Sequence, residues 1–261
     1  MNKAIVIKIG GATLGSHDTT LEDIVQLQKQ GRALVVVHGG GKIISDWLKK
    51  QGVVTKFVRG ERVTDKASLD VVTAVLAGLT NKEIVAAINT LGGRAIGISG
   101  VDGSLVQGKI SDAEMGYVGT VVKVDVEPLE ALLRAGYVPV VAPVSLHAFD
   151  RPSGAPQILN VNADLVAGEI AAAVKAEKLI FLTDVAGISD KSGRLLDRLT
   201  AKEAEELIAS GVASGGMIPK IKACLKALAT TPITRIIDGR QPHVLLNEIR
   251  GKGDGTTIYG G

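Results

Sequence analysis

The sequence of 261 residues has a single cysteine, Cys224, and only 3% aromatic residues. One cysteine excludes an internal disulfide, and its place in an apolar-periodic stretch predicts a buried thiol that packs as a small hydrophobe. Net charge is also low, at +3. Nucleic-acid-binding surfaces need a basic stripe, often with interleaved aromatic residues, so this class of function is disfavoured.

Long hydrophobic runs are missing as well. The longest one, residues 137–146, contains Pro139 and Pro143 and is too short to cross a bilayer. Residues 1–3 lead directly into a short strand pattern, without the apolar region of a signal peptide. We therefore expect a cytoplasmic protein.

Glycine and aliphatic residues are abundant: there are 32 glycines, and 46% of the chain is hydrophobic. Strand patterns at 3–9 and 33–38 alternate with helical patterns at 18–30 and from about residue 40, which predicts a parallel sheet with right-handed crossovers. Further strands are expected at 94–99, 137–144, 178–184 and 233–238, a hairpin within 104–124, and helices at 69–91, 128–136, 162–175, 200–210, 216–229 and 241–248.

Three details of this pattern are open to test. The helical spacing of 69–91 should break near 78–81, where glycine and polar residues interrupt it. The prolines of 137–144 should make that strand short or place it near a sheet edge. A soft boundary near residue 175 divides the chain into two lobes, 1–175 and 176–261, that share one sheet.

Two glycine loops follow strands, at 8–11 (K-I-G-G) and 38–41 (H-G-G-G). Free backbone N–H groups at the start of a helix attract anions, although either loop alone could be no more than a tight turn. The usual nucleotide fingerprints are absent. A phosphate-binding P-loop needs Ser or Thr after Gly41-Lys42, where Ile43 stands, and 97–103 lacks the dinucleotide spacing.

Three polar segments add to these loops. Residues 160–164 (N-V-N-A-D) precede a helix and carry more polar side chains than a helix cap needs. Residues 215–220 (G-G-M-I-P-K) put a lysine in the first helical turn, which the helix dipole disfavours unless an anion lies there. The arginine in 60–65 (G-E-R-V-T-D) could be solvated, or could clamp a carboxylate with two hydrogen bonds.

The motifs K-x-G-G, H-G-G-G, G-x-R-x-T, N-V-N-A-D, D-x-x-G-I (184–188) and G-G-M-x-x-K follow one another over nearly the whole chain. This order resembles the amino acid kinase family, most closely its branch that phosphorylates N-acetyl-L-glutamate with ATP. The resemblance implies a three-layer αβα sandwich around a mainly parallel sheet. Residues 1–175 would bind the acceptor and dimerise, 176–261 would bind ATP, and the acyl phosphate formed would serve arginine or ornithine synthesis.

The resemblance also assigns roles to residues. It implies catalytic roles for Lys8, Lys220, Asp164 and Gly11, acceptor binding by Gly40, Gly41, Arg62 and Asn160, and nucleotide binding by Gly10, Thr183, Asp184, Val185, Gly187, Ile188, Val212, Ala213 and Ser214. We expect the two lysines to neutralise the transferring phosphoryl group from opposite sides, with Asp164 between them. A side chain at Gly40 should displace the acceptor. Mg²⁺ would arrive with ATP, because no cluster has metal-ligand spacing.

Two further residues near these motifs have ordinary explanations. His38, beside the glycine turn, is expected to orient its neighbours by hydrogen bonding rather than to act as an acid or base. Trp47 is expected to be a core or dimer contact rather than a ligand contact.

Three alternatives stay open. A sister kinase could act on α-aminoadipate or glutamate bound to an acidic carrier protein. A non-catalytic metabolite sensor could use the same fold, but that predicts loss of Lys8, Asp164 or Lys220, and all three are present. A dinucleotide-dependent oxidoreductase would need a fingerprint that the chain lacks.

The oligomeric state and regulation are less defined. Arginine-inhibited family members carry an extra N-terminal helix that links dimers into a hexamer, whereas this sequence starts at its first strand, so we expect a homodimer. The tail 243–260 nevertheless resembles the arginine-binding end of those members. The matching residues are His243, Glu248, Gly253, Gly255 and Thr256.

Overall fold

The structure is a computed structural model that describes residues 3–10, 19–58 and 61–260. Its strands are β1 (Ile5–Ile9), β2 (Leu34–His38), β3 (Phe57–Val58), β4 (Glu61–Arg62), β5 (Ala95–Gly100), β6 (Val106–Ile110), β7 (Gly119–Val124), β8 (Val138–His147), β9 (Ile158–Asn160), β10 (Lys178–Thr183), β11 (Arg198–Thr200), β12 (Ile233–Asp238) and β13 (Thr256–Tyr259). Its α-helices are α1 (Thr20–Lys29), α2 (Gly41–Lys50), α3 (Lys66–Thr73), α4 (Asn81–Thr90), α5 (Glu127–Arg134), α6 (Ala163–Ala173), α7 (Ala201–Ala209), α8 (Met217–Ala227) and α9 (Val244–Ile249). A π-helix, η1 (Ala74–Thr80), joins α3 to α4, and short 3₁₀ turns form η2 (Asp102–Ser104) and η3 (Ala113–Met115).

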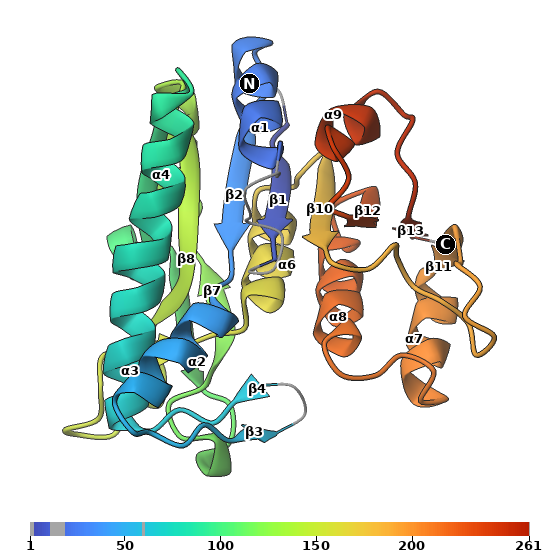
Figure 1. The fold of residues 1–261 in the computed structure, drawn as a ribbon. Coiled ribbons are helices and arrows are strands. Elements are labelled where there is room, and N and C mark those ends of the chain that lie inside the picture. Colours follow the sequence, from blue (N-terminus) through green and yellow to red (C-terminus); the bar gives the residue numbers. More distant parts are fainter. Residues whose placement is uncertain (1–2, 11–18, 59–60, 261) are drawn as a thin grey trace.

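One large sheet runs through the molecule in the order β11-β13-β12-β10-β1-β2-β8-β6-β7, with β5 and β9 also paired to β8. The central pairs are parallel, including β1 with β2 and β1 with β10. The pairing of β1 with β10 makes the sheet continuous between the two halves of the chain, as predicted. In Figure 1 the orange and red residues gather on one side of these strands and the blue and green ones on the other.

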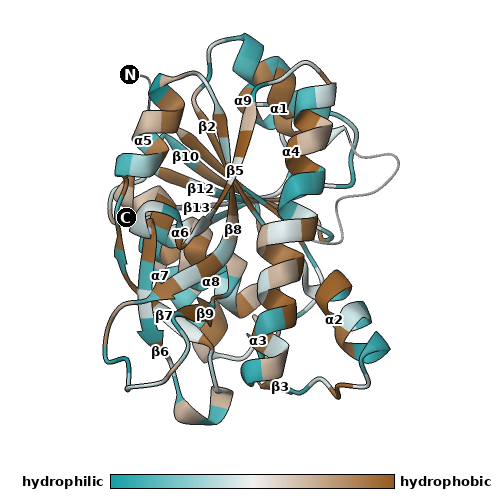
Figure 2. Ribbon diagram, turned by 90° about the vertical axis from the view of Figure 1, so that its left-hand side faces the viewer, coloured by the Kyte–Doolittle hydropathy of each residue, from teal (hydrophilic) through white to brown (hydrophobic). Residues whose placement is uncertain are grey.

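Helices cover both faces of this sheet. Val35 and Val37 of β2 pack into a cluster with residues of α6 and α8, whereas Leu34 and Val36 pack into a cluster with α1 and α4. Alternate side chains therefore enter two separate cores, and the strands read as unbroken apolar runs. The strands that fan through the centre of Figure 2 are accordingly mostly brown. The expected three-layer αβα arrangement is confirmed.

The helical segment after α3 does not break near residues 78–81, so that prediction was wrong. The chain stays helical from Lys66 to Thr90, and the π-helix η1 absorbs the irregular spacing with its wider turn. This segment is long and apolar enough to cross a membrane. Val72 and Val75 pack into one core cluster and Ile84 and Ile88 into another, so we interpret it as a core helix.

The prediction for the strand at 137–144 was also wrong. β8 has ten residues and pairs with four other strands. It tolerates Pro139 and Pro143 because its ladder with β2 involves only Val140 and Val141, which lie between the two prolines.

Candidate active site

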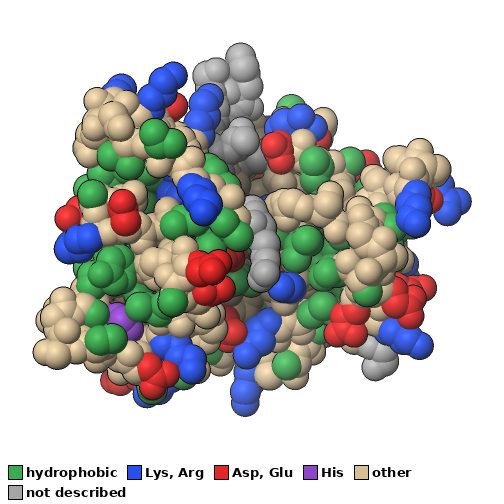
Figure 3. Space-filling model, turned by 90° about the horizontal axis from the view of Figure 1, so that it is seen from below, with side chains coloured by type: hydrophobic (Ala, Val, Ile, Leu, Met, Phe, Trp, Pro, Cys, Tyr) green, Lys and Arg blue, Asp and Glu red, His purple; other side chains and the backbone are tan. Residues whose placement is uncertain are grey.

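A cavity of about 200 Å³ opens at the carboxyl ends of β1 and β2. Parallel α/β sheets bind ligands at this edge. The polar part of its lining comes from segments that are far apart in sequence: Lys8, Gly39, Gly40, Gly41, Glu61, Arg62, Asn160, Asn162 and Asp164. Figure 3 views the molecule from this side, and the surface is hollowed between the two halves, with Lys and Arg side chains along the hollow.

Asp164 lies between two lysines. Lys8 Nζ is 2.7 Å from Oδ1 and Lys220 Nζ is 3.0 Å from Oδ2. The side chains of Asp164, Lys8 and Lys220 are 6%, 8% and 15% exposed, respectively. Water therefore screens the attractions between them only weakly. Burial alone would raise the pKa of Asp164, but the two ammonium groups outweigh it and keep this pKa below its usual value. The carboxylate is therefore ionised.

Local structure explains how these three residues meet. Lys8 is next to the last residue of β1, at the centre of the sheet. Asp164 lies in the first turn of α6, where its N–H donates to the capping side chain of Asn162. Lys220 comes from the first turn of α8, which packs against α6. The expected convergence of both lysines on Asp164 is present in the structure.

The glycine loop closes another wall of the cavity. β2 ends at His38, and α2 begins at Gly41, so unpaired N–H groups of the first helical turn and its positive dipole end lie there. A Cβ built on Gly40 would approach Leu76 Cδ2 to 2.8 Å, whereas one on Gly41 meets nothing within 4 Å. A side chain at Gly40 would therefore strike Leu76, and its effect on the acceptor stays a prediction.

Arg62 and Asn160 belong to one hydrogen-bond network. Arg62 Nη2 donates to Gly41 O at 2.9 Å and to Ser45 Oγ at 2.8 Å, and the guanidinium stacks 4.7 Å from the Phe57 ring centre. Its Nη1 is buried and has no partner among the described residues. An unpaired buried donor on a charged group is costly, so this atom is well suited to an anionic ligand.

The orientation of the Asn160 amide follows from its neighbour Thr64. The Thr64 hydroxyl donates its one hydrogen to Arg62 O at 2.9 Å, so the Asn160 atom 3.0 Å from it must be the donor Nδ2. The carbonyl Oδ1 of Asn160 is then the atom left to accept a hydrogen from a ligand in the cavity.

The described residues expected to bind nucleotide are not among those that line this cavity. Thr183 ends β10 beside β1, and the loop with Asp184, Val185, Gly187 and Ile188 follows it. Val212, Ala213 and Ser214 precede α8. Ile188 and Ala213 are buried in the core, so only their backbone could face a nucleotide. Gly10 follows β1, and Gly11 lies outside the described residues.

Comparisons with known proteins agree with this arrangement. The profile of the amino acid kinase family matches residues 3–238. This chain belongs to the amino acid kinase family. It is 52% identical over 259 residues to a protein named acetylglutamate kinase from Dehalococcoides mccartyi strain CBDB1, a match that covers 99% of this chain and 95% of the relative. The predicted family and fold are thus confirmed.

Solved structures of similar fold include two with moderate identity. The protein smu.665 from Streptococcus mutans UA159 superposes with a TM-score of 0.83 at 29% identity, covering 99% of both chains. An N-acetylglutamate synthase from Neisseria gonorrhoeae, complexed with coenzyme A and N-acetyl-glutamate, also gives 0.83 at 27% identity, covering 98% of this chain and 59% of that one.

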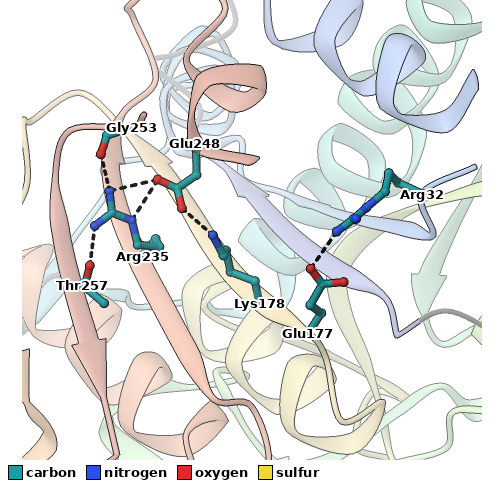
Figure 4. Close-up of polar contacts among 7 residues, drawn as sticks. All are labelled: Arg32, Glu177, Lys178, Arg235, Glu248, Gly253 and Thr257. Carbon is teal, nitrogen blue, oxygen red and sulfur yellow. Dashed lines mark hydrogen bonds and ion pairs between the residues drawn. The ribbon is translucent and has the colours of Figure 1, made fainter. Parts of the chain in front are cut away.

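The tail residues that resemble an arginine-binding end are engaged within the chain. Glu248 accepts from Lys178 through Oε1 at 2.8 Å and from Arg235 through Oε2 at 2.9 Å, as Figure 4 shows. Arg235 also donates to Gly253 O at 2.8 Å and to the Thr257 hydroxyl. The Glu248 carboxylate is thus engaged by the guanidinium of Arg235 and the ammonium of Lys178.

The other tail residues also have internal contacts. The His243 ring lies 2.8 Å from Asp23 Oδ1, and the Thr256 hydroxyl accepts from Ile188 N at 2.8 Å. Gly255 has φ of 131° and no room for a Cβ, which would lie 2.5 Å from Ile236 O.

Two buried residues near the cavity were not identified as functional from the sequence. Thr64 and Asn81 are both fully buried beside the cavity or its glycine loop. Thr64 was visible as the last residue of the G-x-R-x-T motif. Asn81 was visible as an amide within an otherwise apolar helical run, which is a signal that we interpreted as a helix break. Trp47 is 41% exposed, so it is not a core residue, whereas Cys224 is buried as expected.

Proposed function

We propose that this chain transfers the γ-phosphoryl group of ATP to the side-chain carboxylate of N-acetyl-L-glutamate, forming N-acetyl-L-glutamyl 5-phosphate for arginine or ornithine synthesis. The observation that carries the proposal is one cavity that combines the Lys8–Asp164 ion pair with an unpaired guanidinium nitrogen on Arg62. The high identity to a protein named acetylglutamate kinase supports the same reaction.

The acceptor would be held by groups that match its three polar ends. The free Nη1 of Arg62 suits the α-carboxylate, and Asn160 Oδ1 suits the acetamido N–H. The N–H groups of Gly40 and Gly41 suit the side-chain carboxylate. Gly11, outside the described residues, is proposed to join them at the transferring group.

Phosphoryl transfer then needs positioning and charge neutralisation more than proton chemistry. A carboxylate oxygen of the acceptor forms the new bond to the γ-phosphorus while the bond to the β,γ-bridging oxygen breaks and ADP leaves. Because the acceptor carboxylate is ionised, no general base is required. Lys8 and Lys220 would stabilise the charge on the transferring group, and Asp164 would keep both ammonium groups fixed and offset their repulsion.

The nucleotide is proposed to bind to residues 176–261, and the acceptor to residues 1–175. Thr183, Asp184 and Val185 with Gly187 would approach the nucleotide from the end of β10, and Val212 to Ser214 from the loop before α8. Each oxygen of Asp164 contacts a lysine ammonium, and these two positive charges disfavour a metal ion beside it. Mg²⁺ would be held by the ATP phosphates, whose charge it would reduce.

A homodimer is part of the proposal. The segment Lys66–Thr90 is strongly apolar, yet less than half of it is buried, and Ala74, Gly78 and Ala86 are exposed along it. Small exposed residues on an apolar helix suit contact with a second copy. Light scattering would give twice the chain mass.

We place the enzyme in the cytoplasm. Binding of arginine near Glu248 would have to compete with Arg235.

The test is hydroxylamine trapping of acyl phosphate with ATP and Mg²⁺, comparing N-acetyl-L-glutamate, glutamate, aspartate and α-aminoadipate. Hydroxamate from N-acetyl-L-glutamate alone is the expected result. Product only with a carrier-bound acceptor would replace the proposal with the sister kinase. No product from any acceptor, with binding of N-acetyl-L-glutamate retained, would replace it with a sensor.

A further inference from the structure

His38 connects the glycine loop (39–41) to helix α4 through hydrogen bonds. It is the last residue of β2 and is fully buried. Its Nδ1 lies 3.0 Å from Gly39 O, and its Nε2 lies 3.2 Å from Nδ2 of Asn81, the first residue of α4. Both ring nitrogens are therefore engaged, one with the loop that lines the cavity and one with the helix behind it.

The direction of these hydrogen bonds follows from the lysine after Asn81. Lys82 Nζ lies 3.0 Å from Asn81 Oδ1, and an ammonium can only donate. Asn81 Nδ2 is therefore the amide nitrogen, and its two hydrogens are shared among His38 Nε2 at 3.2 Å, Val140 O at 2.9 Å and Ile98 O at 3.3 Å. A flipped Asn81 would place two carbonyl oxygens against each other, so both contacts give the same orientation.

Asn81 Nδ2 can only donate and Gly39 O can only accept, so in a neutral ring His38 Nε2 is the acceptor. The hydrogen of the neutral imidazole then lies on Nδ1 and is donated to Gly39 O. Burial, with smaller effects of Lys8 and Lys82, lowers the pKa of His38 to about 4, so the ring is neutral at neutral pH.

We propose that Lys82, Asn81 and His38 form a one-way hydrogen-bond chain that fixes the Gly39–Gly40 peptide and points the Gly40 N–H into the cavity. A trans peptide is planar, and its C=O and N–H point in opposite directions. Holding Gly39 O on the His38 side turns the Gly40 N–H to the other side, where Gly40 lines the cavity beside Lys8. Within the described residues this N–H has no other partner.

The chain also has an electrostatic effect. It begins at a positive charge, and each donated hydrogen polarises the next group. The Gly39–Gly40 amide at its end becomes a stronger donor toward an anionic oxygen. His38 is thus a positioning residue, which acts through the Gly40 amide and touches no substrate itself.

Packing around Asn81 indicates that the arrangement is built into the fold. A Cβ on Gly97 would lie 1.9 Å from Asn81 Oδ1, so only glycine leaves room for this amide between β5 and α4. The π-helix η1 directly precedes Asn81, and its Leu76 packs against Gly40. Wide π turns are rare and often lie at functional sites. Here one irregular helix supports the glycine loop at two points.

The first experiment needs no substrate, so it is independent of the proposed kinase reaction. Long-range ¹H–¹⁵N NMR spectra of the imidazole rings distinguish the two neutral tautomers, and the His38→Gln variant identifies the signal of His38. The expected result at pH 7 is a neutral ring with its hydrogen on Nδ1. A hydrogen on Nε2, or a protonated ring, would overturn the proposal.

Two variants then separate the two ring nitrogens. His38→Asn places an amide N–H near the position of Nδ1 and can keep the donor to Gly39 O, whereas His38→Gln keeps a group near Nε2 and loses that donor. We expect His38→Gln to lower kcat about tenfold to a hundredfold, with KM for the acceptor changed less than about threefold. His38→Asn should restore most of kcat.

Only this kinetic experiment depends on the proposed kinase function. Equal kcat in the Gln and Asn variants, at matched melting temperatures, would overturn the positioning role. If the protein lacks kinase activity, the NMR signal of the Gly40 amide is compared instead. Loss of the donor should move its ¹H resonance upfield in His38→Gln but not in His38→Asn, and no difference between the variants would again overturn it.

Discussion

The ammonium of Lys8 lies 2.7 Å from Oδ1 of Asp164, and both side chains are almost completely buried. Lys220 contacts the other oxygen of the same carboxylate. Two buried like charges would repel, and one shared carboxylate removes most of that cost while leaving a net positive charge beside the cavity. The triad therefore suits a reaction in which negative charge on a phosphoryl group must be balanced.

Replacing either lysine should remove this balance. We expect Lys8→Ala and Lys220→Ala each to lower kcat by about 10²- to 10³-fold, because a donor to the transferring group is lost. In each variant Asp164 keeps one lysine partner, so circular dichroism spectra should stay near native. Steady-state kinetics with ATP and N-acetyl-L-glutamate measure the effect.

Lys66→Ala is the matched control, because Lys66 is exposed and its ion pair within the described residues is with Asp70 on its own helix. Its kcat should equal that of the unchanged protein. Near-normal turnover in Lys8→Ala or Lys220→Ala would rule out the assigned mechanism.

Thr64 should determine how well the acceptor binds. Thr64→Val removes the hydroxyl that fixes the Asn160 amide, so the amide can rotate and Oδ1 is no longer held toward the ligand. We expect KM for N-acetyl-L-glutamate to rise about tenfold, which corresponds to loss of about 1.4 kcal/mol. KM for ATP should be unchanged.

Thr64→Ser keeps the hydroxyl and should retain KM within about threefold. If the Val and Ser variants bind the acceptor equally well, the hydroxyl does not orient Asn160. Titration of the acceptor by calorimetry, without ATP, separates this binding effect from turnover.

The sheet could be predicted because its strands are buried on both faces, so a run such as 179–182 (L-I-F-L) is apolar at every position. Lys8, Asp164 and Lys220 could be predicted because each stands at a fixed place in a motif beside a strand end or a helix start. Their distances were not predictable from the sequence alone, since α6 and α8 must first pack together.

The π-helix and Asn81 were missed for a physical reason. A residue added to one helical turn shifts the apolar period, and in the sequence this resembles a break. The partners of Asn81 on β2, β5 and β8 are 43, 17 and 59 residues away, and no local pattern relates them. The ten-residue β8 was missed because the effect of a proline depends on which neighbouring strand its missing N–H would face.

The Arg235–Glu248 pair should matter for stability. Glu248→Gln leaves the buried Arg235, and Lys178 beside it, without their shared counter-charge. Removing one partner of a buried ion pair costs about 3 kcal/mol or more, which urea unfolding would measure. Glu177→Gln is the control, because its pair with Arg32 is more than one-third exposed on average and should contribute less than about 1 kcal/mol. Equal destabilisation would contradict the prediction.

The same pair predicts the response to arginine. The guanidinium of Arg235 already contacts the Glu248 carboxylate. We therefore expect L-arginine to inhibit the Arg235→Ala variant at concentrations that leave the activity of the unchanged protein unaffected. Activity measured against L-arginine for both proteins tests this. Inhibition of the unchanged protein at micromolar L-arginine would mean that the effector displaces Arg235 or binds elsewhere.

His38 should make folding stability depend on pH in a defined window. Its pKa is about 4 in the folded protein, because of burial and the nearby charges of Lys8 and Lys82, against 6.5 in an unfolded chain. As pH falls below 6.5 the unfolded state binds a proton that the folded state does not, so stability falls. The slope is about 1.4 kcal/mol per pH unit, or about 3 kcal/mol in total down to pH 4.

Other groups also titrate in this range, so the comparison must be made between two proteins. Asp164, whose pKa is lowered, changes the balance only below its usual value near pH 4. The unfolding free energies of the unchanged protein and of His38→Gln would be measured by urea at pH 7, 6, 5 and 4. As the pH falls from 7 to 4, the unfolding free energy of the unchanged protein should drop by about 3 kcal/mol more than that of the variant. Parallel curves would mean that His38 is already protonated in the fold, or that it is exposed, and the one-way chain to Gly39 could not then exist.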